Sequence, residues 1–197
     1  MNKKIDIPFL QETADEIILL YEKYGSENYD GEPVSQMSHM VQSAMLARES
    51  ADQELILGSF LHDIGHLLKH EHPNELMGDF GVRDHEGIGA AYLIERGFSK
   101  RIVAVVQMHV SAKRFLVATD EKYASKLSMA STETLKWQGG PMNQLEVNDF
   151  KSNPYFEDII KVRLWDEKAK VFNMPVLPLS YFKNLIFIHL KNELKDV

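Results

Sequence analysis

The sequence predicts an all-α fold, a compact helical bundle formed by a single domain over residues 1–197. Apolar residues recur at helical spacing through most of the chain, and no segment shows the strict alternation of a half-buried strand. The length of 197 residues suits one domain, and neither an internal repeat nor a low-complexity linker divides it. We therefore expect one domain that ends in a C-terminal helix at about 178–195.

The first three expected helices lie before residue 70. Residues 9–24 carry apolar side chains at helical spacing, and Gly25 ends the pattern. A polar turn follows, and Pro33 suits the first turn of a helix over about 33–50. The next segment, about 52–69, contains LILGSFLHDIGHLL and is apolar enough to form the central helix.

Turn and capping residues delimit the remaining helices. A loop containing Pro73 follows the central helix, and Asp84 is a suitable N-cap for a helix that extends through Arg96. Ser99 is expected to cap another helix, which carries His109. The sequence QGGPM breaks a later helix, and two more segments complete the all-α domain. These last three helices are expected at 121–137, about 154–170 and about 178–195.

The composition restricts the chemistry and the partners. The chain has no cysteine, which excludes disulfides, thiolate zinc sites and iron–sulfur clusters, so any metal must bind to nitrogen and oxygen. The net charge of −7 argues against a general nucleic-acid binder. No continuous apolar run reaches the ~20 residues of a membrane span, and the first ten residues lack the apolar stretch of a secretory signal. We therefore expect a cytoplasmic protein without nucleic-acid or membrane partners.

The central helix carries His62, Asp63 and His66. Because positions three and four apart on a helix share a face, His66 is expected one turn beyond both of the others. Two buried histidines and a buried carboxylate need partners, and a bound metal cation would supply them. For one histidine alone, a hydrogen bond to a backbone carbonyl is the commoner explanation.

Other histidines and aspartates along the chain strengthen the metal-site hypothesis. With six ligand candidates, one tetrahedral zinc has too many, and a carboxylate that bridges two ions explains them better. Imidazole with carboxylate suits zinc, iron, manganese or cobalt, and the spacing does not choose among them. The candidates are, in order, His39, His62, Asp63, His85, His109 and Asp166. The histidines of a polar loop and of the C-terminal helix are not expected to bind metal: His70, His72 and His189.

This ordered pattern resembles the metal-binding signature of the HD-domain superfamily, whose members are mostly phosphohydrolases. His85 and His109 resemble the additional ligands of its dinuclear members. More specifically, the chain is similar, from about residue 15 to about residue 170, to the HD-domain phosphonate oxygenases, which are mixed-valent di-iron enzymes. The blocks that carry this similarity are YDGEPVSQMSH (29–39), FLHDIGH (60–66), DHEGIGAAYL (84–93), HVSAKRFLV (109–117) and KLSMASTETLKWQGGPM (126–142).

The resemblance implies a centre of two iron ions in the mixed-valent Fe(II)/Fe(III) state. It implies that Tyr29 occupies an iron position until substrate displaces it, and that Glu32 is the acidic partner of this switch and faces the amine end of the substrate. Without the resemblance, these would be a loop tyrosine and a first-turn glutamate. The implied iron ligands are His39, His62 and Asp166 for one ion and His85 and His109 for the other, with Asp63 as the bridge.

A cationic pocket beside the metals is predicted from helical register. Lys113 lies four residues after His109 and Arg163 three residues before Asp166, so each shares a helix face with an expected ligand. Arginine can bind two phosphonate oxygens at once. The expected substrate-binding residues are Glu32, Asp63, His66, Lys113, Ser131 and Arg163, of which Glu32 and His66 are also expected, with Tyr29, to serve catalysis.

The resemblance implies an oxygenase that cleaves the carbon–phosphorus bond of a small 1-hydroxy-2-aminoethylphosphonate-type substrate with O2 and releases phosphate. The alternative is a metal-dependent phosphohydrolase acting on a phosphate ester, in which two metals would activate water. Tyr29 with Glu32 favours the oxygenase, since a hydrolase has no need of a displaceable tyrosine. A third hypothesis is a binding protein that retains the fold without catalysis, although no ligand position is missing.

Overall fold

The computed structural model describes residues 7–29, 31–69 and 84–195, and its regular secondary structure is helical. The all-α prediction is therefore confirmed. The predicted loop at 70–83, with His70 and His72, lies outside the described residues. The helices are α1 (Ile7–Tyr24), α2 (Gln36–Ala47), a 3-10 turn (Arg48–Ser50), α3 (Gln53–Leu61), α4 (Ile64–Leu67), α5 (His85–Glu95), α6 (Lys100–Thr119), α7 (Glu121–Ala124), α8 (Met129–Trp137), α9 (Gln144–Lys151), α10 (Phe156–Lys168) and α11 (Leu179–Glu193).

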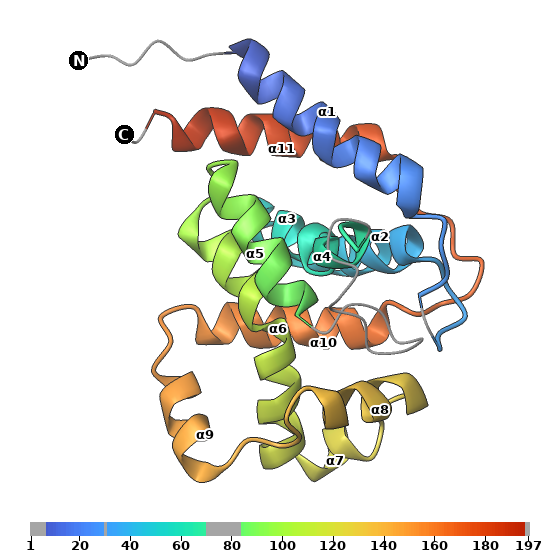
Figure 1. Cartoon of the computed structure of the whole chain (residues 1–197), viewed down its shortest axis with the longest axis vertical. Coiled ribbons are helices and arrows are strands. Elements are labelled where there is room, and N and C mark those ends of the chain that lie inside the picture. The colour runs from blue at the N-terminus through green and yellow to red at the C-terminus, as the bar shows by residue number, and fades with distance from the viewer. Residues whose placement is uncertain (1–6, 30, 70–83, 196–197) are drawn as a thin grey trace.

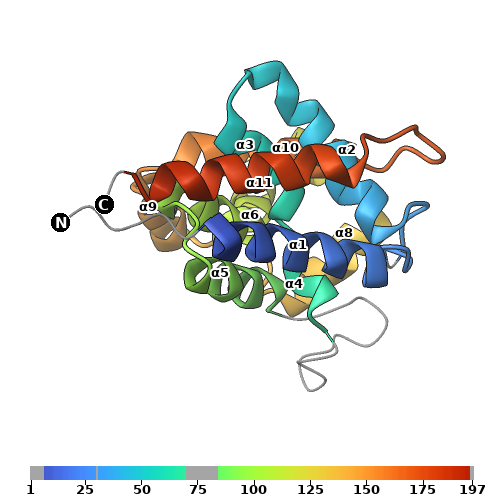
Figure 2. The ribbon, with the colours of Figure 1, turned by 90° about the horizontal axis from the view of Figure 1, so that it is seen from above.

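The bundle is organised around α3 and α6. Helix α3 packs against α2 and α6, and α6 also contacts α5 and α10. Helices α1 and α11, from opposite ends of the chain, lie side by side across one end of the molecule (Figures 1 and 2). The short helices α7, α8 and α9 lie at the opposite end in Figure 1. The middle layer, formed by α2 to α6 and α10, holds the six predicted metal ligands.

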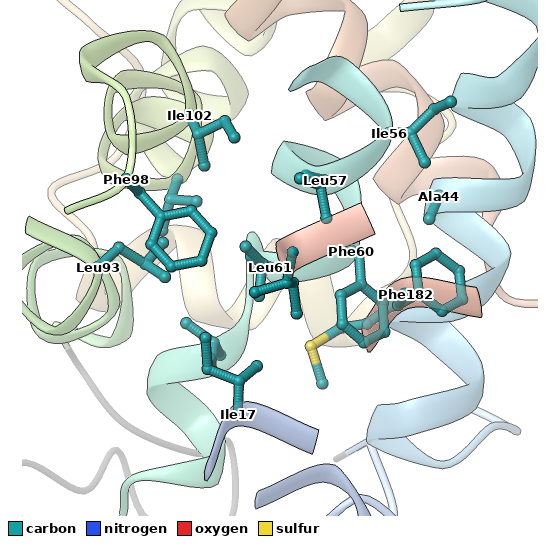
Figure 3. Close-up of a cluster of buried hydrophobic side chains, with 14 of the residues drawn as sticks. Ile17, Ala44, Ile56, Leu57, Phe60, Leu61, Leu93, Phe98, Ile102 and Phe182 are labelled. Atoms are coloured by element: carbon teal, nitrogen blue, oxygen red, sulfur yellow. The ribbon is translucent and has the colours of Figure 1, made fainter. Parts of the chain in front are cut away.

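One apolar core joins the end helices to the middle layer (Figure 3). The ring of Phe60 on α3 is stacked between Tyr21 of α1 and Phe182 of α11, at centroid distances of 4.3 and 4.1 Å. The Tyr21 hydroxyl donates a hydrogen bond to the Phe60 carbonyl oxygen, 2.5 Å away, so its buried polar atom is satisfied. Burial of each such aromatic side chain stabilises the fold by roughly 1.5–3 kcal/mol.

The predicted helix over 52–69 is not continuous. Helix α3 ends at Leu61, and Asp63 has φ −105° and ψ 15°, outside the α-helical region, before α4 resumes at Ile64. Because of this break, the Asp63 side chain leaves the backbone in a different direction than it would in a continuous helix. The expectation that His62, Asp63 and His66 share one regular helix face is therefore wrong, although the chain does return His66 to the same site.

Other boundaries differ for local reasons. Pro33 precedes α2 rather than entering it, because Ser35 is the N-cap and its hydroxyl accepts from the Ser38 N–H at 3.2 Å. The segment expected as one helix over 121–137 is two helices, since Ser128 caps a second start. Helix α9 was not predicted; Asn143 forms a capping box with Glu146 at its first turn.

A glycine allows α4 to lie directly on the start of α5. A Cβ atom on Gly65 would lie 2.0 Å from the His85 carbonyl oxygen, a distance that no side chain tolerates. Gly89, one turn further along α5, faces the same contact, where a Cβ would lie 3.1 Å from the Ile64 side chain. The absence of a side chain at Gly65 therefore lets the start of α5 lie close enough to bring His85 to Asp63.

Helix α6 is the one described helix that is long and apolar enough to cross a membrane by length and composition. It is also a core helix: 56% of its apolar window is buried inside the protein. Its buried residues include His109 and Lys113, which face the site described next.

Candidate metal centre

The six predicted metal ligands converge from five helices or helix ends. Helix α2 supplies His39, the break between α3 and α4 supplies His62 and Asp63, and α5, α6 and α10 supply one residue each. All are buried, with no more than 4% of any residue exposed. The structure therefore brings together His39, His62, Asp63, His85, His109 and Asp166.

The first group contains His39, His62 and Asp166. Nε2 of His39 lies 3.2 Å from Nε2 of His62 and 3.2 Å from Oδ1 of Asp166. Nε2 of His62 lies 3.8 Å from the same oxygen. Three ligand atoms from α2, the end of α3 and α10 thus surround one point in the interior.

The second group contains His85 and His109, whose Nε2 atoms lie 3.0 Å apart. Asp63 stands between the groups. Its Oδ1 lies 3.3 Å from Nε2 of His85 and 3.2 Å from Nε2 of His109. Its Oδ2 lies 3.5 Å from Nε2 of His39 and 3.4 Å from Nε2 of His62. One carboxylate therefore presents one oxygen to each pair of histidines.

Backbone carbonyls orient three of these imidazoles. Nδ1 of His39 lies 2.9 Å from the Ala169 oxygen, Nδ1 of His62 lies 2.8 Å from that of Ser59, and Nδ1 of His109 lies 2.7 Å from that of Val106. A carbonyl only accepts, so each Nδ1 carries a proton and each Nε2 can offer its lone pair inward. This is the tautomer and orientation that metal-binding histidines adopt.

The carboxylates of the centre are short of donors. Both oxygens of Asp63 and Oδ1 of Asp166 are buried and accept no well-aligned hydrogen bond from the described residues. Buried charged oxygens without donors are costly, and ring nitrogens 3.0–3.2 Å apart repel one another where both present lone pairs. Cations at these two points would satisfy both sets of atoms, so the residues present fit a metal centre.

Without metal, a proton on a histidine supplies part of the positive charge that compensates the buried carboxylates. Burial by itself lowers the pKa of His62, but the Asp63 and Asp166 carboxylates outweigh it and raise the pKa to about 10. At His109 burial prevails over the attraction of Asp63, and the pKa is lowered. The pKa values of both carboxyl groups lie well below their usual range, despite burial: His62 is the main cause for Asp63 and Arg163 for Asp166.

A small pocket of about 50 Å³ opens beside the second group. Lys113 and Arg163 line one wall of it and are almost fully buried. The Lys113 ammonium donates to Thr134 Oγ1 at 3.0 Å, and the Arg163 guanidinium donates to Tyr123 Oη at 2.7 Å. Burial and the neighbouring Arg163 lower the pKa of Lys113 to about 7. Two buried cations that line one pocket are suited to a small anion.

The remaining predicted residues also line this pocket: Tyr29, Glu32, His66 and Ser131. The Tyr29 ring is stacked on His39 with centroids 4.1 Å apart, and the His66 ring is stacked on His85 at 4.0 Å. Burial, with the Asp63 and Asp166 carboxylates, raises the pKa of Tyr29 well above its usual value. Each predicted site residue is therefore at the centre or in the pocket beside it.

Sequence reasoning missed Glu167 and Lys170. The Arg163 guanidinium pairs with Glu167, and Nζ of Lys170 lies 3.2 Å from Oε1 of Glu167 and 2.9 Å from Oε1 of Glu32. Glu167 lies four residues after Arg163, and Lys170 four after Asp166, so the i,i+4 rule could have found them. They were overlooked because charged residues near a helix end are usually solvated.

His189, which was not expected to bind metal, has a structural environment. Its Nε2 accepts the Ser99 N–H at 3.2 Å, and its ring is stacked on Phe98. Its ligand atoms come close to those of Glu54 and Glu193. However, Arg101 lies 3.2 Å from Glu54, so a protein cation already compensates that carboxylate.

Comparison with known proteins gives the family. No family model matches the chain. The chain is 40% identical over 168 residues to the [1-hydroxy-2-(trimethylamino)ethyl]phosphonate dioxygenase (glycine-betaine-forming) of Leisingera caerulea, covering 85% of each protein. It is 36% identical over 194 residues to the hydroxymethylphosphonate dioxygenase of Gimesia maris, covering 92% of this chain and 94% of that protein. It is 40% identical over 187 residues to an uncharacterized protein of Acanthamoeba polyphaga mimivirus, covering 94% of this chain and 85% of that one. The chain belongs to the family of phosphonate dioxygenases.

Proposed function

We propose that this protein is a di-iron oxygenase with an HD-domain fold that cleaves the carbon–phosphorus bond of a small 1-hydroxyphosphonate. The observation that carries the proposal is the position of Asp63, which presents one oxygen to His39 and His62 and the other to His85 and His109. A bridging carboxylate of this kind organises two metal ions next to a cationic pocket. The family of the relatives supports the oxygenase over the hydrolase.

The proposed iron ligands form the two groups that are seen in the structure. His39, His62 and Asp166 would hold one iron, and His85 and His109 the other, with Asp63 shared. When bound, a mixed-valent pair would supply the redox chemistry that no side chain of this protein can supply. Imidazole and carboxylate are suitable ligands for iron, although they also suit manganese and zinc. The choice of iron rests on the resemblance to the di-iron phosphonate oxygenases.

The overall reaction balances as R–CH(OH)–PO3²⁻ + O2 → R–COO⁻ + HPO4²⁻ + H⁺. The carbon–phosphorus and carbon–hydrogen bonds break, the carbon is oxidised to a carboxylate, and O2 takes up four electrons. In this scheme Lys113 and Arg163 bind the phosphonate oxygens and fix the substrate carbon beside the metals. The oxygens retain these partners as phosphate is released, so the same cations also bind the product.

Tyr29 and His66 control access to the metals in this proposal. The Tyr29 ring is stacked on His39, and the charges of Asp63 and Asp166 help to raise the pKa of its hydroxyl. A tyrosine so placed can occupy a metal position before substrate arrives and so restrict reaction with O2. Burial and the neighbouring His85 hold the pKa of His66 well below its usual value, so His66 is neutral and able to accept or donate a hydrogen bond.

The carbon substituent of the substrate is the finer part of the proposal. One relative is named for a trimethylaminoethyl substrate and another for hydroxymethylphosphonate, which carries no substituent. The resemblance to the di-iron phosphonate oxygenases implies a 2-aminoethyl-type substituent, because it implies that Glu32 faces the amine. That expectation requires the Glu32 carboxylate to be available to the substrate.

The test of the proposed function is phosphate release that depends on oxygen. Purified protein loaded with iron under anaerobic conditions should release phosphate from hydroxymethylphosphonate or 2-amino-1-hydroxyethylphosphonate only after O2 is added. The expected stoichiometry is one O2 consumed per phosphate. Equal release with and without O2, or release from phosphate esters with manganese under strict anaerobiosis, would instead establish a phosphohydrolase. No phosphate from any 1-hydroxyphosphonate would overturn the proposal.

A further inference from the structure

Lys170 and Glu32 form an ion pair at the edge of the pocket. Nζ of Lys170 lies 2.9 Å from Oε1 of Glu32, and the Ser128 hydroxyl donates to the same oxygen at 2.5 Å. Only 11% of the Lys170 side chain and 8% of the Glu32 side chain are exposed. An ion pair so shielded from water is stronger than one on the surface, and separating it leaves two poorly solvated charges.

Lys170 also belongs to a chain of alternating charges that extends to the metal centre. It pairs with Glu167, which pairs with Arg163, which pairs with Asp166. Two cations and two carboxylates, Glu32 and Glu167, therefore balance one another beside Asp166. Glu32 and Glu167 are thus each already paired with a cation, so neither carboxylate is free to attract a further one.

The walls of the pocket indicate where each part of a hydroxyphosphonate lies. Asp63, His85 and His109 form the metal wall, and Lys113 and Arg163 form the cationic wall. A carboxylate repels a phosphonate dianion, so Glu32 faces the carbon substituent and not the phosphonate. Any substituent that reaches Glu32 therefore meets the ion pair of Glu32 with Lys170.

We propose that Lys170 is a specificity-determining residue that selects 1-hydroxyphosphonates with an uncharged substituent, or with none, over those with an ammonium group. This inference rests on the proposed function and names its substrate class. An ammonium substituent would either lie beside Lys170, which places two cations on the Glu32 carboxylate, or displace Lys170, which leaves the lysine only Glu167, a carboxylate that already binds Arg163. A carboxylate substituent would face Glu32 itself. A small uncharged substituent leaves the ion pair intact.

The kinetic test compares two substrates in three proteins. The iron-loaded wild type should show kcat/KM at least tenfold higher for hydroxymethylphosphonate than for 2-amino-1-hydroxyethylphosphonate. Lys170→Met frees Glu32 and should shift this ratio at least tenfold toward the amine. Lys168→Met is the matched control, because Lys168 is an exposed lysine two residues before Lys170, at the end of α10, and its ratio should be that of the wild type. A wild-type preference for the amine, or an unchanged ratio in Lys170→Met, would overturn the inference.

A binding measurement separates this inference from the proposed function. Calorimetry of the same two phosphonates with the iron-loaded protein, without oxygen, requires no turnover. If no phosphonate is cleaved, the proposed function fails, and the affinities still test Lys170. Tenfold tighter binding of hydroxymethylphosphonate to the wild type supports the inference, and equal or tighter binding of the amine refutes it. The affinities of the wild type for the two phosphonates are sufficient to refute the inference. The test therefore remains valid even if Lys170→Met folds poorly.

Discussion

His85 and His109 direct their Nε2 atoms at each other across 3.0 Å, although the Nδ1 atom of His109 is already bonded to the Val106 carbonyl. Two imidazoles in this orientation present lone pairs to one point unless a cation lies there. Asp63 brings an oxygen to 3.3 and 3.2 Å from the same two atoms. A positive charge at this point would satisfy both nitrogen atoms and the Asp63 oxygen.

Metal binding should release protons. In the metal-free protein the pKa of His62 is raised to about 10, so this imidazole is protonated at neutral pH. A metal needs the neutral imidazole, so each ion that enters the first group expels this proton. The apparent affinity for Fe(II) or Mn(II) should therefore rise by up to about tenfold per pH unit between pH 6 and 9. Calorimetric titration in buffers of different ionisation enthalpy measures the protons released; a value of zero would contradict the electrostatics described here.

Gly65→Ala should disrupt the second metal group without touching a ligand. The new Cβ would lie 2.0 Å from the His85 carbonyl oxygen, so the start of α5 must move away from Asp63. We expect a loss of roughly 1–3 kcal/mol in the free energy of unfolding and loss of the second metal ion. Gly89→Ala is the milder comparison, since its closest contact is the Ile64 side chain at 3.1 Å and not a backbone oxygen at 2.0 Å, so it should retain the second ion. Equal metal content in the Gly65 variant and the wild type would disprove this role for the α4–α5 contact.

Lys113→Met should stabilise the metal-free protein and weaken phosphonate binding. The folded pKa of Lys113 is about 7 and the ordinary value is 10.5, so the unfolded chain binds this proton more tightly. Wild-type stability should therefore rise with pH between about 7 and about 10.5, and the variant should lack this rise. At pH 7.5 the gain on substitution is on the order of 4 kcal/mol, less the lost Thr134 hydrogen bond.

Urea unfolding at pH 7 and pH 9.5 measures the effect, with Lys122→Met, an exposed lysine, as the control. The metal content of Lys113→Met should equal that of the wild type, while the Kd for hydroxymethylphosphonate should rise at least tenfold. A variant that is less stable than the wild type at both pH values would show that Lys113 is a structural cation.

The Tyr29→Phe variant should bind both metal ions but lack the hydroxyl that is proposed to occupy a metal position before substrate binds. The Tyr29 ring would keep its stacking on His39 as phenylalanine, so the fold and the metal content should not change. Wild-type protein loaded with iron should show visible absorption from a tyrosine bound to Fe(III), and a 1-hydroxyphosphonate should abolish it. The variant should lack this absorption, whereas Tyr181→Phe, in the core beside Phe182, should retain it. Identical spectra for both variants would exclude Tyr29 as a metal ligand.

The sequence predicts the all-α class and the ligand set because both depend on local features. Each ligand is an ionisable residue on or beside an apolar helical segment, which is unusual without a partner. The break at Asp63 was not predictable in the same way: LHDIGH contains no proline, and its apolar spacing suits a continuous helix. The conformation of Asp63, at φ −105° and ψ 15°, results from tertiary contacts that include the approach of Gly65 to His85.

Lys170 shows a second limit of prediction from sequence. It lies two residues beyond the end of α10, where a lysine ordinarily extends into water and stabilises the helix dipole. Its partner Glu32 is distant in sequence and follows a turn in which the Glu32 N–H donates to the Tyr29 carbonyl. Only the packing of these two segments reveals that Glu32 already has a cation.

The number of metal ions bound per chain tests the central claim most directly. Protein loaded anaerobically with iron and freed of excess should contain two ions per chain, and Asp63→Ala should contain no more than one, because the shared carboxylate is lost. Asp149→Ala, which removes an exposed aspartate from α9, should retain both. Two ions in the wild type and in Asp149→Ala, but not in Asp63→Ala, is the predicted result. One ion per wild-type chain, or two in Asp63→Ala, would contradict a dinuclear centre organised by Asp63.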